Sequence, residues 1–154
     1  NGYTLESDLV FPLNFVPAPS LLSTYSIADQ TVVAGDNIRF DINRVHTGYS
    51  IKHGPGSAII TLAGAGLYSG AFNANFTALA SGPATFQLYR NGVAVEGAVA
   101  EHQATANVPI AVAFPILELV RPSCVAVDNT ASFTVQVSAA GTINTANIDL
   151  VKDA

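Results

Sequence analysis

Residues 66–92 read GLYSGAFNANFTALASGPATFQLYRNG, and this stretch decides the fold class. From Tyr68 to Phe76 every second residue is apolar or glycine, while the residues between them are mostly polar. A period of two places one set of side chains in a core and the other in water, which is typical of a β-strand. A second alternating run, residues 85–90, ends at Asn91-Gly92, a pair that tolerates positive φ and favours a tight hairpin. The stretch therefore predicts antiparallel strands.

The rest of the chain continues this pattern. Short β-branched or alternating runs recur at 31–34, 38–42, 58–62, 93–98, 106–120, 133–137 and 146–152, separated by Gly, Pro, Asn or Asp. Residues 43–50 are polar and are predicted to form a loop. About ten short strands at this spacing predict an all-β antiparallel sandwich or barrel.

Residues 1–23 differ from the rest because they contain Pro12, Pro17 and Pro19 and apolar residues without a period. Proline fixes φ and lacks an amide donor, which favours an extended segment. We expect an N-terminal arm or stalk connection over residues 1–23, lying along its own domain or a neighbouring subunit. A head domain is expected over residues 24–154.

The composition predicts an oligomer. Of the 154 residues, 49% are hydrophobic and only 11% are charged, against roughly 25% charged in an ordinary domain. Large exposed apolar surfaces mark interaction sites, so an oligomer interface is expected. The alternative is a secreted β-protein whose surface consists mostly of Ser, Thr, Asn and Ala.

Several classes of partner and chemistry are not predicted. The net charge is −5 and no run of Lys or Arg exists, which disfavours nucleic-acid binding. No apolar stretch reaches the roughly 20 residues of a membrane span. The only cysteine, Cys124, is expected to be a buried thiol. No nucleophile elbow is present and the histidine spacing fits no metal site, so neither an enzyme nor a cofactor is predicted.

The run 106–120 is apolar on both faces of a strand. Ile110, Val112 and Phe114 alternate with Ala111 and Ala113, and no face is charged around them. A strand of this kind is covered on both faces. One face is expected to meet the core of its own subunit and the other to meet a partner.

Three motifs in order carry a resemblance: Gly66-Leu67-Tyr68, the hairpin LYRNG at 88–92, and ANIDLVK at 146–152. Together they resemble the jelly-roll head shared by complement-type globular domains and tumour necrosis factor (TNF). Within that group they resemble the bacterial branch that ends collagen-like spore-surface glycoproteins, the BclA type. The likeness covers about residues 24–153 and implies a ten-stranded jelly-roll sandwich that packs as a homotrimer. Residues 1–23 carry no Gly-X-Y repeat, which leaves room for a phage or virion protein with the same head.

Two groups of candidate residues follow. The candidates for the trimer interface or the core are Tyr68, Phe72, Phe76, Phe86, Ile110, Val112 and Phe114. The candidates for recognition lie in or near the loops 43–56 and 99–106 and are His46, Tyr49, His53 and His102.

We therefore expect a non-enzymatic, trimerising structural head of a bacterial surface or spore-layer filament or appendage. The alternative is a phage or virion attachment head that recognises glycan or protein. Either reading places the chain outside the cell or on a particle surface, whether spore exosporium, cell surface or virion. The expected partners are two further copies of the chain and filament or virion proteins or a surface glycan.

Overall fold

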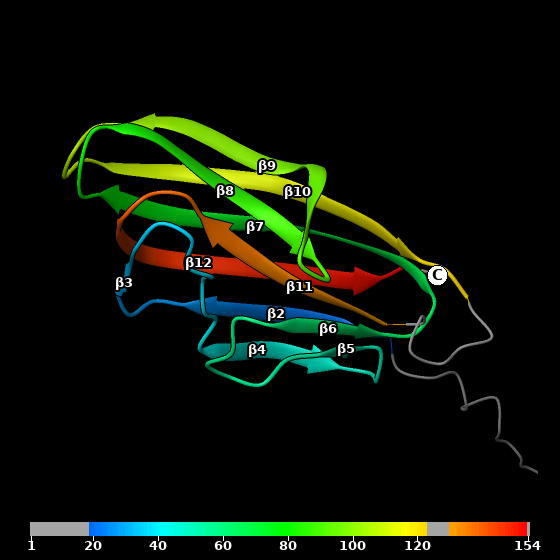
Figure 1. Ribbon diagram of the computed structural model, residues 1–154. Coiled ribbons are helices and arrows are strands. Elements are labelled where there is room, and N and C mark those ends of the chain that lie inside the picture. Colours follow the sequence, from blue (N-terminus) through cyan, green and yellow to red (C-terminus); the bar gives the residue numbers. More distant parts are fainter. Residues whose placement is uncertain (1–18, 123–129, 154) are drawn as a thin grey trace, which may run out of the picture.

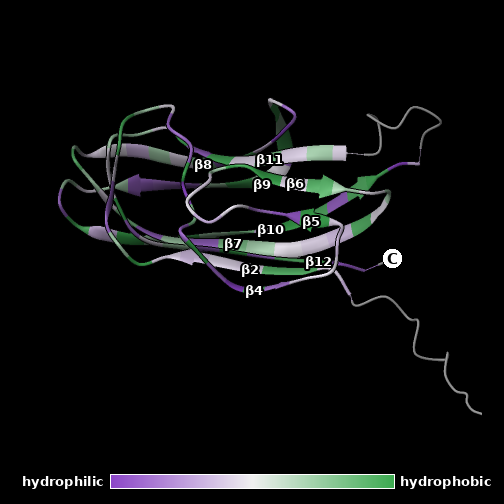
Figure 2. Cartoon of the chain, turned by 90° about the horizontal axis from the view of Figure 1, so that it is seen from below, coloured by the Kyte–Doolittle hydropathy of each residue, from purple (hydrophilic) through white to green (hydrophobic). Residues whose placement is uncertain are grey.

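The computed structural model describes residues 19–122 and 130–153, which form strands and turns and no helix. Two antiparallel sheets pack face to face as two layers (Figures 1 and 2). The predicted all-β antiparallel sandwich is confirmed. Within the described residues no helix is long and apolar enough to cross a membrane.

The six-stranded sheet has the order β10-β7-β12-β2-β4, with β3 also paired to β12. Its strands are β2 (Leu21–Ser26), β3 (Gln30–Val32), β4 (Ile42–Thr47), β7 (Gly66–Ala78), β10 (Pro109–Val120) and β12 (Gly141–Lys152). The five-stranded sheet has the order β5-β6-β11-β8-β9. Its strands are β5 (Ile51–Lys52), β6 (Ile60–Ala63), β8 (Gly82–Arg90), β9 (Val93–Ala104) and β11 (Thr130–Val137).

Strand β7 confirms the alternation that the sequence predicts. Tyr68, Phe72 and Phe76 are fully buried between the sheets, whereas Asn73 and Asn75 are exposed. The strand pairs with β10 on one side and β12 on the other, so its backbone N–H and C=O groups have hydrogen-bond partners along nearly its whole length. This central place explains why its sequence pattern is so regular.

Phenylalanine rings join the two layers. Phe72 on β7 stacks against Phe114 on β10, with ring centroids 5.0 Å apart, and against Phe86 of the opposite sheet at 6.3 Å. Phe40, in the connection before β4, meets Phe72 edge-on at 6.3 Å, and Phe76 meets Phe86 edge-on at 5.3 Å. The cluster buries apolar area from both sheets, which is the main stabilising contribution to such a sandwich.

The predicted hairpin at Asn91-Gly92 is confirmed, since these residues have φ of 52° and 83° and join β8 to β9. Strand β9, however, continues to Ala104 and not to residue 98 as predicted. A bulge lets it pass Gly97, where φ is 89°. The side-chain amide of Gln87 fills this bulge by donating to the Val95 carbonyl at 2.7 Å.

Residues 42–52 correct the predicted loop over 43–50. Residues 42–47 form β4 and residues 51–52 form β5, the outermost strands at one edge of the two sheets, and only residues 48–50 form a bend between them. Edge strands carry polar, exposed side chains, so β4 has the composition of a loop. Residues 38–41 were predicted to lie in a strand but form a connection, in which Ile38 and Phe40 are buried. The side chain of Gln30 holds this connection through both backbone groups of Arg39, at 2.6 and 3.0 Å.

The first and last described strands lie side by side. The backbone amide of Lys152 donates to the Ser20 carbonyl at 3.0 Å, and β2 runs antiparallel to β12 (Figure 1). Strand β2 begins at Leu21, so the boundary expected after residue 23 falls within a strand. Most of the expected arm, residues 1–18, and Cys124 lie outside the described residues.

Candidate interaction surface

The outward face of β10 is an exposed apolar row. Val112, Phe114 and Ile116 point inward and are buried. The outward positions alternate with them and are all apolar and all exposed in the single chain: Pro109, Ala111, Ala113, Pro115, Leu117 and Leu119. The most exposed large side chain among them is that of Leu117, at 65%. We call these six residues the β10 row.

The free edge of β10 is a poor template for a further strand. β10 pairs with β7 and with no other described strand. Pro109 and Pro115 have no amide hydrogen to donate, and the Leu119 carbonyl is occupied by Arg90 Nη1 at 2.9 Å. Prolines on an edge strand hinder edge-to-edge pairing. The row is therefore suited to contact through side chains and not to extension of the sheet.

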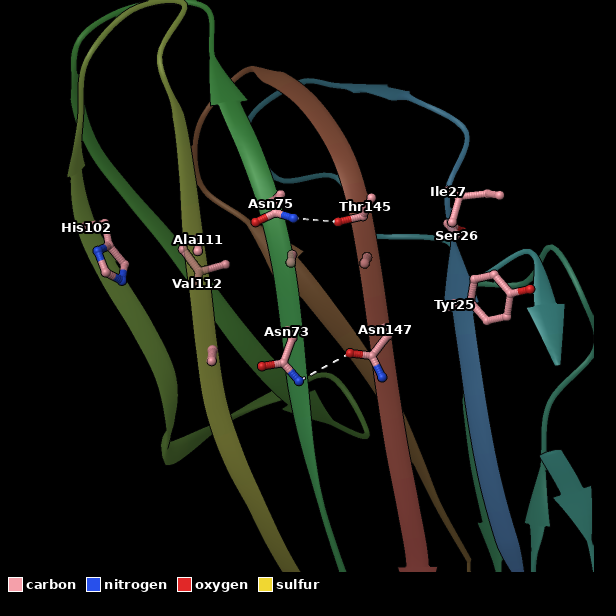
Figure 3. A pocket seen from close by; sticks show the side chains of 13 residues that line it. Tyr25, Ser26, Ile27, Asn73, Asn75, His102, Ala111, Val112, Thr145 and Asn147 are labelled. Atoms are coloured by element: carbon pink, nitrogen blue, oxygen red, sulfur yellow. Dashed lines mark hydrogen bonds between the residues drawn. The ribbon is translucent and has the colours of Figure 1, made fainter. Parts of the chain in front are cut away.

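Beside the β10 row the sheet is hollowed (Figure 3). The hollow measures about 700 Å³ and crosses β10, β7, β12 and β2. Tyr25 and Ile27 stand at one side of it and His102 of β9 at the other (Figure 3). Among residues 19–122 and 130–153, no Asp, Glu, Lys or Arg lines it. Such a surface fits an uncharged partner surface, because no fixed charge has to be desolvated or matched.

A polar ladder forms the floor of the hollow. The Asn73 amide donates to Asn147 Oδ1 at 3.2 Å, and the Asn75 amide donates to Thr145 Oγ1 at 2.8 Å (Figure 3). These bonds join β7 to β12 and fix the orientation of the amides. Each amide keeps further donor or acceptor capacity for a partner. The floor is thus preorganised and uncharged.

The described residues of this surface include few titratable groups. Within residues 19–122 and 130–153, no three His, Cys, Asp or Glu side chains gather as a metal site. His102 is the only imidazole at the hollow, and no carboxylate lies beside it in the lining. General acid–base or nucleophilic catalysis needs a positioned partner group. The arrangement supports non-covalent contact.

The structure places the interface-or-core candidates inside the subunit. Those buried in the core are Tyr68, Phe72, Phe76, Phe86, Val112 and Phe114, and Ile110 packs against the core partly buried. The Tyr68 hydroxyl donates to the Gly64 carbonyl at 2.7 Å, and burial raises the pKa of this phenol. The aromatic candidates therefore join the two sheets of one chain, whereas the residues of the β10 row lie outside the core and are exposed.

The recognition candidates do not form one site. His46 lies on β4 and Tyr49, 86% exposed, follows it, whereas His102 lies on β9 at the opposite edge of the sandwich. His53, expected on an exposed loop, is only 6% exposed. Its ring is enclosed because the chain after β5 folds over it, with the Ser57 carbonyl 2.8 Å from Nε2.

Sequence reasoning missed the polar ladder. It placed Asn73 and Asn75 on an outward face, but their partners Asn147 and Thr145 lie in β12, about seventy residues further along the chain. The register between strands that far apart cannot be read from one sequence. The outward polar residues of β7 were the only feature of the sequence that pointed to the polar ladder.

Comparison with known proteins shows the fold. No protein-family model matches the chain, and no curated protein matches it. Among solved structures, murine APRIL at pH 5.0 superposes with a TM-score of 0.64 at 10% identity, covering 88% of this chain and 99% of that one. The globular domain of the zebrafish complement 1qA protein gives 0.66 at 9% identity, covering 89% and 98%. The PRD1 vertex protein P5 gives 0.54 at 15% identity, covering 86% and 96%. The chain therefore has the jelly-roll fold of TNF and C1q domains.

Proposed function

We propose that this chain is the non-enzymatic structural head of a bacterial surface or spore-layer filament or appendage, and that it acts as a homotrimer. The observation that carries the proposal is the β10 row, six consecutive outward positions that are apolar and exposed in the single chain. Water contact with such a row is unfavourable, and burial against another copy relieves it. The uncharged hollow beside the row suits the same partner.

The edge chemistry disfavours an open assembly built by strand addition. Because two prolines interrupt the free edge of β10, copies are expected to meet through side chains and not by strand addition. Side-chain contact around a rotation axis closes a ring, whereas edge pairing propagates into fibres. The resemblance to TNF and complement heads supports an assembly of three copies.

The test is the oligomeric state of the full 154-residue chain. Light scattering after size exclusion is expected to give three times the 15.9 kDa mass of one chain. Ala113→Arg places a charge in the centre of the β10 row and is expected to yield monomer, because an unpaired buried charge is costly. Ala80→Arg, in the exposed turn between β7 and β8, is the matched control and is expected to stay trimeric.

Two results would contradict the proposal. One is a monomer for the unmodified chain at micromolar concentration. The other is an Ala113→Arg variant that associates as well as Ala80→Arg. The surface location is tested separately, by labelling intact cells and spores with antibodies against the head. Absence of labelling on a trimeric protein would refute the location alone.

The alternative function is a phage or virion attachment head that recognises glycan or protein. One observation favours it: the amides of Asn73 and Asn147 and the ring of Tyr25 offer the neutral hydrogen bonds and the flat apolar face that sugars need. The likeness to a vertex protein supports the same fold in a virion setting. A glycan array with the full chain tests it, and binding that Tyr25→Ala abolishes would favour this alternative.

A further inference from the structure

His53 lies between two oxygen atoms. Its Nδ1 is 2.6 Å from Asn43 Oδ1, and its Nε2 is 2.8 Å from the Ser57 carbonyl oxygen. The residue is 6% exposed, and Phe40 packs edge-on against the ring with centroids 6.3 Å apart. Water therefore has little access to take the place of either contact.

The two contacts require more hydrogens than a neutral ring has. A neutral imidazole carries one N–H, and its other nitrogen is an acceptor. Both oxygens here are acceptors as well, so one of the two contacts then sets a lone pair against a lone pair. Only the imidazolium ion donates to Asn43 and Ser57 at the same time.

Turning the Asn43 amide does not remove the conflict. Its Nδ2 donates to the His53 backbone carbonyl at 2.8 Å in the present orientation. The reversed amide would donate to Nδ1 of the ring but would set Oδ1 against that carbonyl oxygen. In the neutral state one hydrogen bond is lost in either orientation.

These contacts lie at the edge where β4 and β5 belong to different sheets and do not pair with each other. Asn43 belongs to β4, the edge of the six-stranded sheet, and His53 follows β5, the edge of the five-stranded sheet. His46 on β4 adds a second link, with Nε2 2.8 Å from the Ile51 carbonyl oxygen. Side chains therefore join the two edges, beside two backbone bonds: Gly56 N–H donates to the Phe40 carbonyl at 2.9 Å and Phe40 N–H donates to the Ser57 carbonyl at 3.3 Å.

We infer that Asn43, His53 and Ser57 form a protonation-dependent latch between the two sheets. With His53 neutral, the latch lacks one of its three hydrogen bonds, whichever way the Asn43 amide is turned. With His53 protonated, it makes all three. The change in bonding is confined to the edge formed by β4, β5 and the chain after β5.

The surroundings set the pH range in which the latch changes. Burial lowers the pKa of His53 below its usual value, the Ser57 carbonyl opposes this by stabilising the cation, and His46 lowers the pKa further. The full set of three hydrogen bonds therefore forms in acid, while the buried charge makes the fold as a whole less stable there.

The other charged side chains on the elements around His53 bond elsewhere or are exposed to solvent. Arg44 of β4 donates through Nη2 to Ser23 Oγ at 2.9 Å, and the side chain of Lys52 on β5 is exposed. Arg39 and Asp41, the sequence neighbours of Phe40, do not contribute to the shift of the His53 pKa. Residues 54–59 carry no charged side chain. His46 is the titratable neighbour that lowers the pKa of the His53 ring.

The experiment is a titration of the full chain followed by nitrogen-15 NMR of the histidine rings and the Asn43 amide. We expect one protonated and one bare ring nitrogen for His53 at pH 7.5, and two protonated nitrogens in acid. The Asn43 side-chain amide signals should shift with the same midpoint, because the amide changes its bonding with the ring. Asn43 signals that stay fixed throughout the His53 titration would overturn the inference.

Asn43→Asp tests the same contact by substitution. A carboxylate at this position stabilises the imidazolium, so the His53 midpoint should rise by about one pH unit or more, a tenfold gain in proton affinity. Asn107→Asp, on the loop between β9 and β10, adds the same charge elsewhere and should leave the midpoint in place. Equal midpoints in the two variants would overturn the inference. If Asn43→Asp does not fold, His53→Gln takes its place, and its Asn43 amide signals must then lose their pH dependence.

Discussion

Replacing Phe72 by alanine tests whether the ring cluster joins the two sheets. Phe72 is fully buried and contacts rings from three other segments, those of Phe40, Phe86 and Phe114. Truncation of a buried phenylalanine costs about 3–5 kcal/mol, and each ring pair adds about 0.5–1.5 kcal/mol. With three pairs lost, Phe72→Ala should lower the free energy of unfolding by at least about 5 kcal/mol. That loss is a large part of the roughly 5–15 kcal/mol of a typical domain.

Phe133→Ala is the matched control. Phe133 on β11 is equally buried but makes no ring contact within the described part of the chain. Its truncation should cost about 3–4 kcal/mol, from transfer and cavity alone. The chain has no tryptophan, so urea unfolding is followed by far-ultraviolet circular dichroism at one fixed protein concentration. A Phe72→Ala loss no larger than that of Phe133→Ala would refute the role given to the ring contacts.

Three further predictions concern other parts of the fold. Gly70→Ala should destabilise the chain by about 1–3 kcal/mol or prevent folding, since the new methyl group would overlap the Asp149 carbonyl of β12, and thermal unfolding measures this. Gln87→Met should cost about 1–3 kcal/mol in urea unfolding, because carbonyls around the β9 bulge lose their donor. For His53, the folded pKa lies below the unfolded value of 6.5, so its contribution to stability is present above pH 6.5 and is lost as the pH falls through the folded pKa. His53→Gln should flatten that part of the pH profile, and an unchanged profile would contradict the assignment.

The sequence predicted those strands and turns whose local residue pattern matches their surroundings in the folded chain. Strand β7 is central and half of its side chains are buried, so its period of two is regular from Tyr68 to Phe76. Asn91 and Gly92 adopt the positive φ that their types favour. Strand β4 could not be predicted, because an edge strand is polar on the sides that meet water. Residues 38–41 were predicted as strand but form a connection, because buried residues that alternate in sequence need not form a strand.

The candidate surface was predictable only in part. Strand β10 is apolar at every outward position, a property of neighbouring residues that one sequence displays. The ladder from Asn73 to Asn147 depends on register between distant strands, and the burial of His53 depends on how the chain after β5 folds back. Both are set by long-range packing. Sequence reasoning therefore found the row but not the hollow beside it or the latch.

The position of β12 has a consequence for synthesis of the protein. This strand comes last among the described strands, yet it lies within the six-stranded sheet, bonded to β7, β2 and β3. Until a ribosome has released residues 141–152, β2 and β7 have no strand between them and the sheet stays divided. Folding of the head must wait for that release, and pairing of such distant segments is slow. A chain stalled before residue 141 would expose unpaired edges to other nascent chains, so chaperone binding should be strongest at that stage.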